Sequence, residues 1–228
     1  ELAKWGEVST NGQVSGRRNI VINGGMQVAQ RATSATGKGE NDNDYFTVDR
    51  FRHVFAGGGA GRITSSQVAS GLNGFGKALK LDCTTVDTSI AADELFIIQQ
   101  NLEGQDVQAI GKGVTGAKEV TLSFYVKANA AFDFVAELQD QDNSRTNGRV
   151  FSTTTDWVRH ELTFQADVDD GSSPFDDDNA KSLSINFWLH AGATYTGGTL
   201  ASSWENSTSA NRAAGIDSFF SSTDNNFF

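Results

Sequence analysis

Cysteine is nearly absent from this chain. Cys83 is the one cysteine among 228 residues, so no disulfide can form within the chain, and the class of small disulfide-stapled domains is excluded. Cys83 ends the alternating stretch Leu79-Lys80-Leu81-Asp82-Cys83. We therefore expect it to be a buried small hydrophobe rather than a reactive thiol.

Long apolar runs and an excess of positive charge are also missing. No stretch approaches the roughly 20 apolar residues that a membrane-spanning helix needs, so we expect no membrane insertion. With 28 acidic and 18 basic residues, the net charge is −10. A chain of this charge repels the phosphates of nucleic acid, which is therefore not an expected partner.

The sequence signatures of catalysis are incomplete. Residues 71–77 begin like a phosphate-binding loop, but Ala78 stands where Ser or Thr would hold magnesium, and a strand pattern follows instead of a helix. The three histidines are widely spaced, and there is no Gly-x-Ser-x-Gly elbow. Carboxylates that could serve glycosidase chemistry occur, as they do on many unrelated sheets. We expect a protein that is not an enzyme and that uses no cofactor, apart from a calcium ion considered below.

What the chain has in abundance is two-residue hydrophobic alternation. Val120, Leu122, Phe124 and Val126 alternate with polar residues, and the pattern returns over residues 132–138, 158–164 and 183–189. Such alternation is typical of antiparallel sheets with one solvated face. We predict an all-β, antiparallel jelly-roll β-sandwich with an extended N-terminal arm. Residues 1–40 form the arm or linker, with a short strand near residues 19–23, and residues 41–228 form the sandwich. Short helical turns are expected only within residues 87–95 and 201–214.

Acidic residues gather in the second half of the chain. Calcium takes six to eight oxygen ligands, and the loops of jelly-roll sandwiches often supply them. The candidate ligands are Asp167, Asp169, Asp170, Asp176 and Asp178. The alternative is an acidic loop that is simply solvated.

Three aromatic residues fall on the polar faces of their predicted strands, namely Tyr125, Trp157 and Trp188. Flat aromatic rings stack on sugar rings, while neighbouring polar groups bind the hydroxyls. These three residues are therefore a candidate sugar-binding surface. The alternative is that the terminal segments or a partner subunit cover them.

Two segments resemble the virion proteins of tailed bacteriophages. Residues 19–26, NIVINGGM, with Gln30 and Arg31 shortly after, resemble the INGGM…QR opening of that group, and residues 48–53, VDRFRH, resemble the Asp-Arg-Trp element that follows it. Residues 78–81, 98–103 and 120–128 are similar to its later strands. The second half of the chain is also similar to the jelly roll of carbohydrate-binding modules. Phe51 stands where the phage group usually has Trp.

The resemblance implies a virion structural protein, such as a tail fibre, a tail appendage or a capsid-attached fibre, located on the extracellular particle. Its implied partners are other virion proteins, further copies of itself in a homotrimer, and a host-surface glycan in host attachment. Two alternatives stay open. One is a carbohydrate-binding module that recognises polysaccharide, and the other is an enzyme that degrades envelope polysaccharide.

Overall fold

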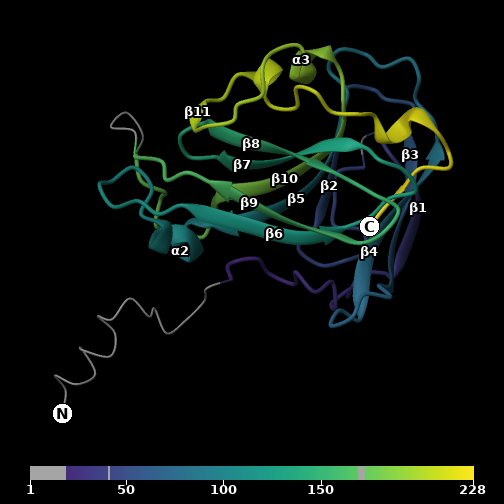
Figure 1. Cartoon of the computed structure of the whole chain (residues 1–228), viewed down its shortest axis with the longest axis horizontal. Coiled ribbons are helices and arrows are strands. Elements are labelled where there is room, and N and C mark those ends of the chain that lie inside the picture. The colour runs from purple at the N-terminus through teal and green to yellow at the C-terminus, as the bar shows by residue number, and fades with distance from the viewer. Residues whose placement is uncertain (1–18, 41, 169–172) are drawn as a thin grey trace.

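The computed structural model describes residues 19–40, 42–168 and 173–228 (Figure 1). Strands dominate it, and every strand pair in these ranges is antiparallel. The strands are β1 (Ser34–Lys38), β2 (Arg52–Ala56), β3 (Arg62–Ala69), β4 (Lys77–Thr85), β5 (Leu95–Glu103), β6 (Val120–Val126), β7 (Asp133–Asp140), β8 (Arg145–Ser152), β9 (Val158–Phe164), β10 (Lys181–Ala191), β11 (Glu205–Asn206) and β12 (Asn226–Phe227). The short helices are α2 (Gly104–Val107) and α3 (Ala193–Thr196), with 3-10 turns η1 (Gln108–Ile110), η2 (Ser209–Asn211) and η3 (Phe219–Ser221). None of the helices in the described ranges is long and apolar enough to cross a membrane.

The strands form two layers. One layer is a six-stranded sheet in the order β11-β8-β7-β10-β5-β2. The other contains the sheets β1-β3-β4-β12 and β6-β9, which are joined by the bridge between Ala128 and Phe227 and by paired backbone hydrogen bonds between Lys127 and Phe228. The predicted antiparallel β-sandwich is confirmed.

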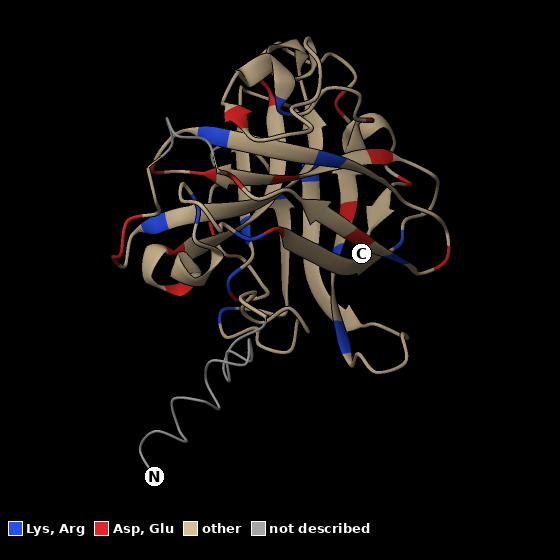
Figure 2. Ribbon diagram, turned by 60° about the vertical axis from the view of Figure 1, so that its left-hand side comes forward, with Lys and Arg blue, Asp and Glu red and all other residues tan. Residues whose placement is uncertain are grey.

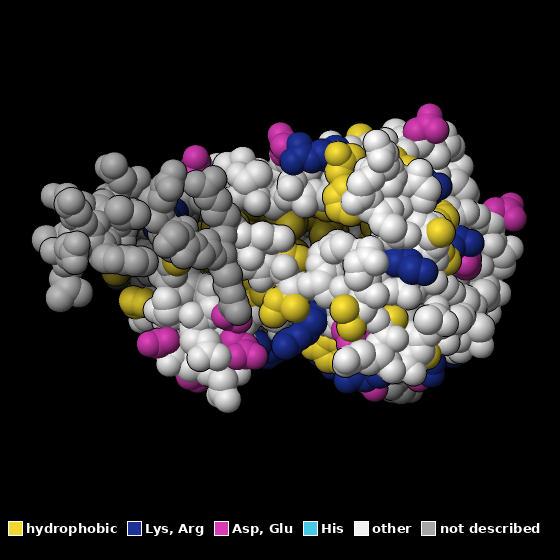
Figure 3. Space-filling view, turned by 90° about the horizontal axis from the view of Figure 1, so that it is seen from below, with side chains coloured by type: hydrophobic (Ala, Val, Ile, Leu, Met, Phe, Trp, Pro, Cys, Tyr) yellow, Lys and Arg dark blue, Asp and Glu magenta, His cyan; other side chains and the backbone are white. Residues whose placement is uncertain are grey.

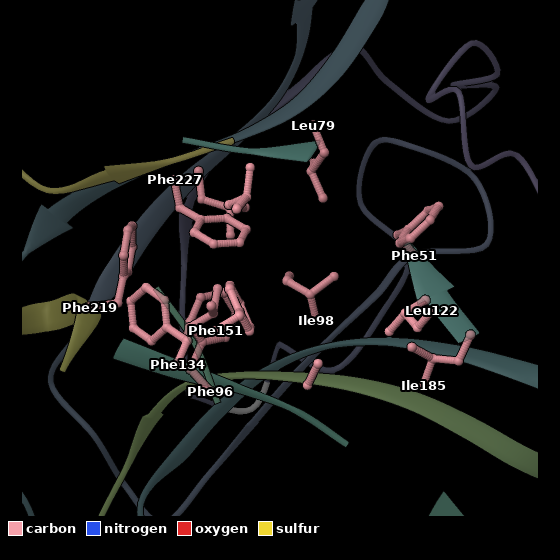
Figure 4. Packing of buried hydrophobic residues seen from close by; sticks show 14 of the residues in the cluster. Phe51, Leu79, Phe96, Ile98, Leu122, Phe134, Phe151, Ile185, Phe219 and Phe227 are labelled. Atoms are coloured by element: carbon pink, nitrogen blue, oxygen red, sulfur yellow. The ribbon is translucent and has the colours of Figure 1, made fainter. Parts of the chain in front are cut away.

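The core lies between the two layers (Figure 4). Inward side chains of the predicted alternating strands fill it, among them Leu81, Leu122 and Phe134. Each large side chain removed from water stabilises the fold by roughly 1.5–3 kcal/mol, so this core is the main stabilising element. Cys83 is buried in it as expected, and burial raises the pKa of its thiol to about 11.

The middle of the six-stranded sheet is buried on both faces, and there the prediction of a solvated outer face is wrong. On β7 and β10 the outward side chains Glu137, Asn186 and Trp188 are as buried as the inward ones. The reason is the segment from α3 to Ile216, which packs over this outer face through Tyr195 and Ala213. Figure 1 shows α3 and its neighbouring loops above the sheet.

The N-terminal elements also differ from expectation. Residues 22–25 form turns instead of a first strand, and the first strand is β1, within a polar stretch. β1 pairs with β3 at a sheet edge and stays largely exposed, so it carries no apolar alternation that could reveal it. Residues 87–95 contain no helix, whereas η2 lies within residues 201–214 as expected. The expectation that helical turns occur only in these two ranges is wrong, because α2, η1, α3 and η3 lie outside both. Of the arm predicted over residues 1–40, residues 1–18 lie outside the described residues.

Candidate functional site

Four aromatic side chains gather on the outer surface of the β6-β9 layer. They are Phe75 from the β3–β4 loop, Tyr125 from β6, Trp157 directly before β9, and Phe228 directly after β12, and we call them the aromatic platform. Phe75 and Tyr125 are 41% and 38% exposed, and the other two are half-buried. Isolated exposed aromatics are common, but four in one place on an outer surface indicate a contact site.

The register of β6 and β9 brings the platform residues together. Tyr125 lies opposite Arg159, and the next pair is Val126 with Val158. Because side chains alternate between the faces of a strand, Tyr125 and Lys127 point away from the core, whereas Val126 points into it. Trp157 precedes Val158 and therefore lies on the same outer face as Tyr125.

The β3–β4 loop holds two of the rings in place. The indole Nε1 of Trp157 donates a hydrogen bond of 3.1 Å to the carbonyl oxygen of Ser70. The Ser70 hydroxyl in turn donates to the carbonyl oxygen of Phe75 and accepts from the backbone N–H of Leu72 at 3.0 Å. Gly74 has a φ of +87°, a conformation that a residue with a side chain rarely adopts. The stretch that begins like a phosphate-binding loop is thus a hairpin loop that presents Phe75.

The rings of the platform are inclined to one another. The centroids of Phe75 and Tyr125 are 5.4 Å apart with planes at 58°, and those of Trp157 and Phe228 are 6.0 Å apart at 72°. The platform is therefore twisted rather than flat. On the face of the molecule seen in Figure 3, hydrophobic side chains lie beside basic ones.

Of the three predicted stacking residues, Tyr125 and Trp157 belong to the platform and Trp188 does not. Trp188 is fully buried, so the prediction that it lies on an exposed face is wrong. Its ring packs against Tyr195 and beneath the guanidinium of Arg212, and its Nε1 donates to a carboxylate oxygen of Glu137 at 3.0 Å. Burial by the α3 segment, which is distant in sequence, removes it from the surface.

The three predicted calcium ligands that the structure describes, Asp167, Asp176 and Asp178, do not form a metal-binding group. Asp167 is buried, and both of its carboxylate oxygens accept hydrogen bonds from Arg145, at 2.9 and 3.0 Å. Asp176 and Asp178 are exposed. Asp169 and Asp170 lie outside the described residues. Within the described ranges, no three acidic, His or Cys side chains form a group that could hold a metal ion.

Buried carboxylates in this region form ion pairs with basic side chains of the protein itself. The ammonium of Lys112 forms an ion pair of 2.5 Å with Asp140, and both side chains are almost completely buried. It also donates to the carbonyl oxygen of Ser173 at 2.7 Å, which ties down the acidic loop. Lys112 and Arg145 thus place positive charge beside the buried carboxylates of Asp140 and Asp167.

A second cluster of ionisable groups lies inside the fold. Burial lowers the pKa of His190, although its Nε2 lies 3.3 Å from a carboxylate oxygen of Glu94. Asp87 lies nearby and accepts a hydrogen bond from the backbone N–H of Ala60. The cavity between these groups holds about 10 Å³, which is room for about one water molecule. A polysaccharide cannot enter it.

The two segments that resemble phage virion proteins contact each other. The Asn23 side chain donates to the carbonyl oxygens of Val28 and Asp49, at 2.9 and 3.0 Å. The Asp49 carboxylate accepts from the backbone N–H of Gln30 at 3.1 Å. Asn23 has a φ of +58°, a conformation that Asn tolerates better than most residues. These segments lock the N-terminal turn onto the sandwich, which is a structural role.

Comparison with known proteins shows no matching family model and no significant match among curated proteins. Among solved structures, the alignment with CBM4 covers 74% of this chain and 88% of the CBM4 chain, with 16% identity and a TM-score of 0.42. The family 11 carbohydrate-binding module of a Clostridium thermocellum cellulosomal cellulase covers 66% of this chain and 84% of its own, with 16% identity and a TM-score of 0.38. The enzymatically active domain of bacteriophage CBA120 tailspike protein 4 covers 74% of this chain and 19% of its own, with 12% identity and a TM-score of 0.38. These values describe likeness in fold and do not define a ligand for this chain.

Proposed function

We propose that this chain is a carbohydrate-binding β-sandwich that recognises polysaccharide without breaking it. The observation that carries the proposal is the aromatic platform, with four partly exposed rings on one outer face. Aromatic rings supply large contact areas for the apolar faces of sugars, and nearby polar groups fix the orientation of the ligand.

The polar groups that such a ligand needs lie along the same face. From Tyr125, the outer face of β6 continues through Ser123 to Thr121, and that of β9 through Glu161 to Thr163. Thr121 and Thr163 lie opposite each other with their hydroxyl oxygens 3.2 Å apart. Hydroxyl and carboxylate groups can donate to and accept from sugar hydroxyls, so a ligand stacked on the rings has hydrogen-bond partners further along the sheet.

We also propose that the protein acts on the outside of a phage particle, in attachment to the host surface. The resemblance of residues 19–31 and 48–53 to phage virion proteins supports this location. Many copies on one particle would strengthen weak single contacts through multivalency, so a shallow surface site of modest affinity suffices.

The test is binding of the purified chain to an array of bacterial and plant polysaccharides. Trp157→Ala and Tyr125→Ala are each expected to reduce binding strongly. Tyr45→Ala, which removes a half-buried tyrosine elsewhere on the molecule, serves as the matched control and is expected to leave binding unchanged. Thermal unfolding of each variant establishes that it is folded. Absence of binding to every polysaccharide, or equal binding by wild type and Trp157→Ala, would refute the proposal.

A further inference from the structure

We infer that the ligand of the aromatic platform is an acidic polysaccharide, and that Lys127 binds the carboxylate of its sugar. This inference rests on the proposed function and names the class of its ligand. The net charge of the chain is −10, and acidic residues are spread around the molecule (Figure 2). In a protein of negative net charge, Lys127 places a positive charge among the rings of the platform.

Lys127 lies at the centre of one half of the platform. Its ammonium nitrogen is 4.5 Å from the ring centroid of Phe228 and 5.2 Å from that of Trp157. The backbone of Lys127 exchanges two hydrogen bonds with Phe228, so the strand and the ring are held at a fixed spacing. A cation over an aromatic face is attracted by the ring's electrostatic field, which orients the side chain but does not neutralise its charge.

Two neighbouring cations of this surface, Lys80 and Arg159, have acidic partners, whereas Lys127 has none among the described residues. Lys80, which also lies near Phe228, forms an ion pair of 2.7 Å with Asp82. Arg159 forms an ion pair with Glu161. The ammonium protons of Lys127 make no hydrogen bond to another described residue, so they are available to a ligand.

The position of Lys127 suits a carboxylate carried by a stacked sugar. A pyranose that lies on a ring of the platform directs its ring substituents outward, toward the groups that border the ring. A uronic acid carries its carboxylate as such a substituent. The hydrogen bond between ammonium and carboxylate is charge-assisted and stronger than a bond to a neutral hydroxyl. A neutral sugar would gain the stacking but not this contact.

The experiment compares matched acidic and neutral ligands. The probes are alginate, polygalacturonate and hyaluronan, each alongside its carboxyl-reduced form, which keeps the sugar rings and loses the charge. The proteins are wild type, Lys127→Gln and the control Lys181→Gln, which changes an exposed lysine at the start of β10 in the other layer. Affinities are measured by titration calorimetry at low and at high salt.

Wild type is expected to bind at least one acidic polymer roughly tenfold more tightly than its reduced form, since the ammonium–carboxylate hydrogen bond is charge-assisted. Lys127→Gln is expected to lose most of this preference and to keep its affinity for the reduced form, while Lys181→Gln behaves as wild type. High salt should weaken the preference.

Equal affinity of wild type for each acidic polymer and its reduced form would overturn the inference, as would a preference that survives Lys127→Gln. Binding of neutral polysaccharides alone, abolished by Trp157→Ala, would also overturn it while leaving the proposed function intact. If neither these polymers nor any glycan of the array binds, the proposed function fails as well.

Discussion

Acid is expected to destabilise the fold through His53, a fully buried residue of β2. Its imidazole packs between Phe46 and Phe96, and its Nε2 lies 2.9 Å from the hydroxyl oxygen of Ser65. Burial lowers the pKa of His53 from 6.5 to about 4, against a smaller opposing contribution from the backbone of Asp44. The folded protein therefore keeps this ring neutral in mild acid.

The sign and size of the effect follow from proton linkage. Above the unfolded pKa of 6.5 the ring is neutral in both states and has no effect on stability. As the pH falls below that value, the unfolded chain binds a proton at His53 that the folded protein does not bind. The free energy of unfolding therefore decreases. The loss continues until the pH reaches about 4, where the folded state also binds the proton. A difference of about 2.5 pKa units, at 1.36 kcal/mol each, amounts to about 3 kcal/mol.

The assay is urea unfolding of wild type and of His53→Gln, a variant whose amide can still hydrogen-bond to Ser65 but cannot titrate. Other groups that titrate in acid, including His190, are common to both proteins and cancel in the difference. Between about pH 7 and about pH 4, wild type should lose about 3 kcal/mol more stability than the variant. A difference between the two proteins that does not change with pH would refute the buried neutral state of His53.

Three further predictions concern the buried Lys112–Asp140 ion pair, the buried Trp188 and the predicted calcium site. Lys112→Met leaves Asp140 as an uncompensated buried charge and is expected to cost about 3–5 kcal/mol in urea unfolding; the control Lys118→Met, at a more exposed position, should have little effect, and equal losses would contradict the assignment. Trp188→Ala should cost about 3–5 kcal/mol of stability without changing polysaccharide binding under conditions where the variant is folded. A specific binding defect in the folded variant would show that Trp188 belongs to the binding site. Addition of calcium or of EDTA should leave the melting temperature unchanged, and a clear upward shift with calcium would show that a metal site exists.

Much of the core could be predicted from the chain alone, because it depends on local periodicity. Alternation over β6, β7, β9 and β10 identified the inward side chains, such as Leu122 and Phe134, since side chains of a strand point to opposite faces whatever the rest of the chain does. The same periodicity placed Tyr125 and Trp157 on an outer face. Composition and the single cysteine excluded a disulfide scaffold for a similarly local reason.

Which residues belong to the candidate site depends on tertiary contacts that the local sequence pattern does not encode. Trp188 and Tyr125 carry the same signal in the sequence, but the α3 segment covers one and leaves the other exposed. Phe75 reaches the platform through a hairpin loop, and Phe228 through pairing of β12 with β4. The spacing of residues in the sequence predicts neither of these positions. Aromatic residues in a glycine-rich loop and next to a terminal strand were nevertheless possible signals.

Periodicity in the sequence by itself determined the class of fold and the inner face of most strands, because both follow from the two-residue repeat of an extended chain. The tertiary structure decided which outward side chains stay exposed and which acidic groups acquire cations. Those outcomes depend on segments far apart in sequence, such as Lys112 meeting Asp140 and Lys127 meeting Phe228, and on what each segment covers when the layers close.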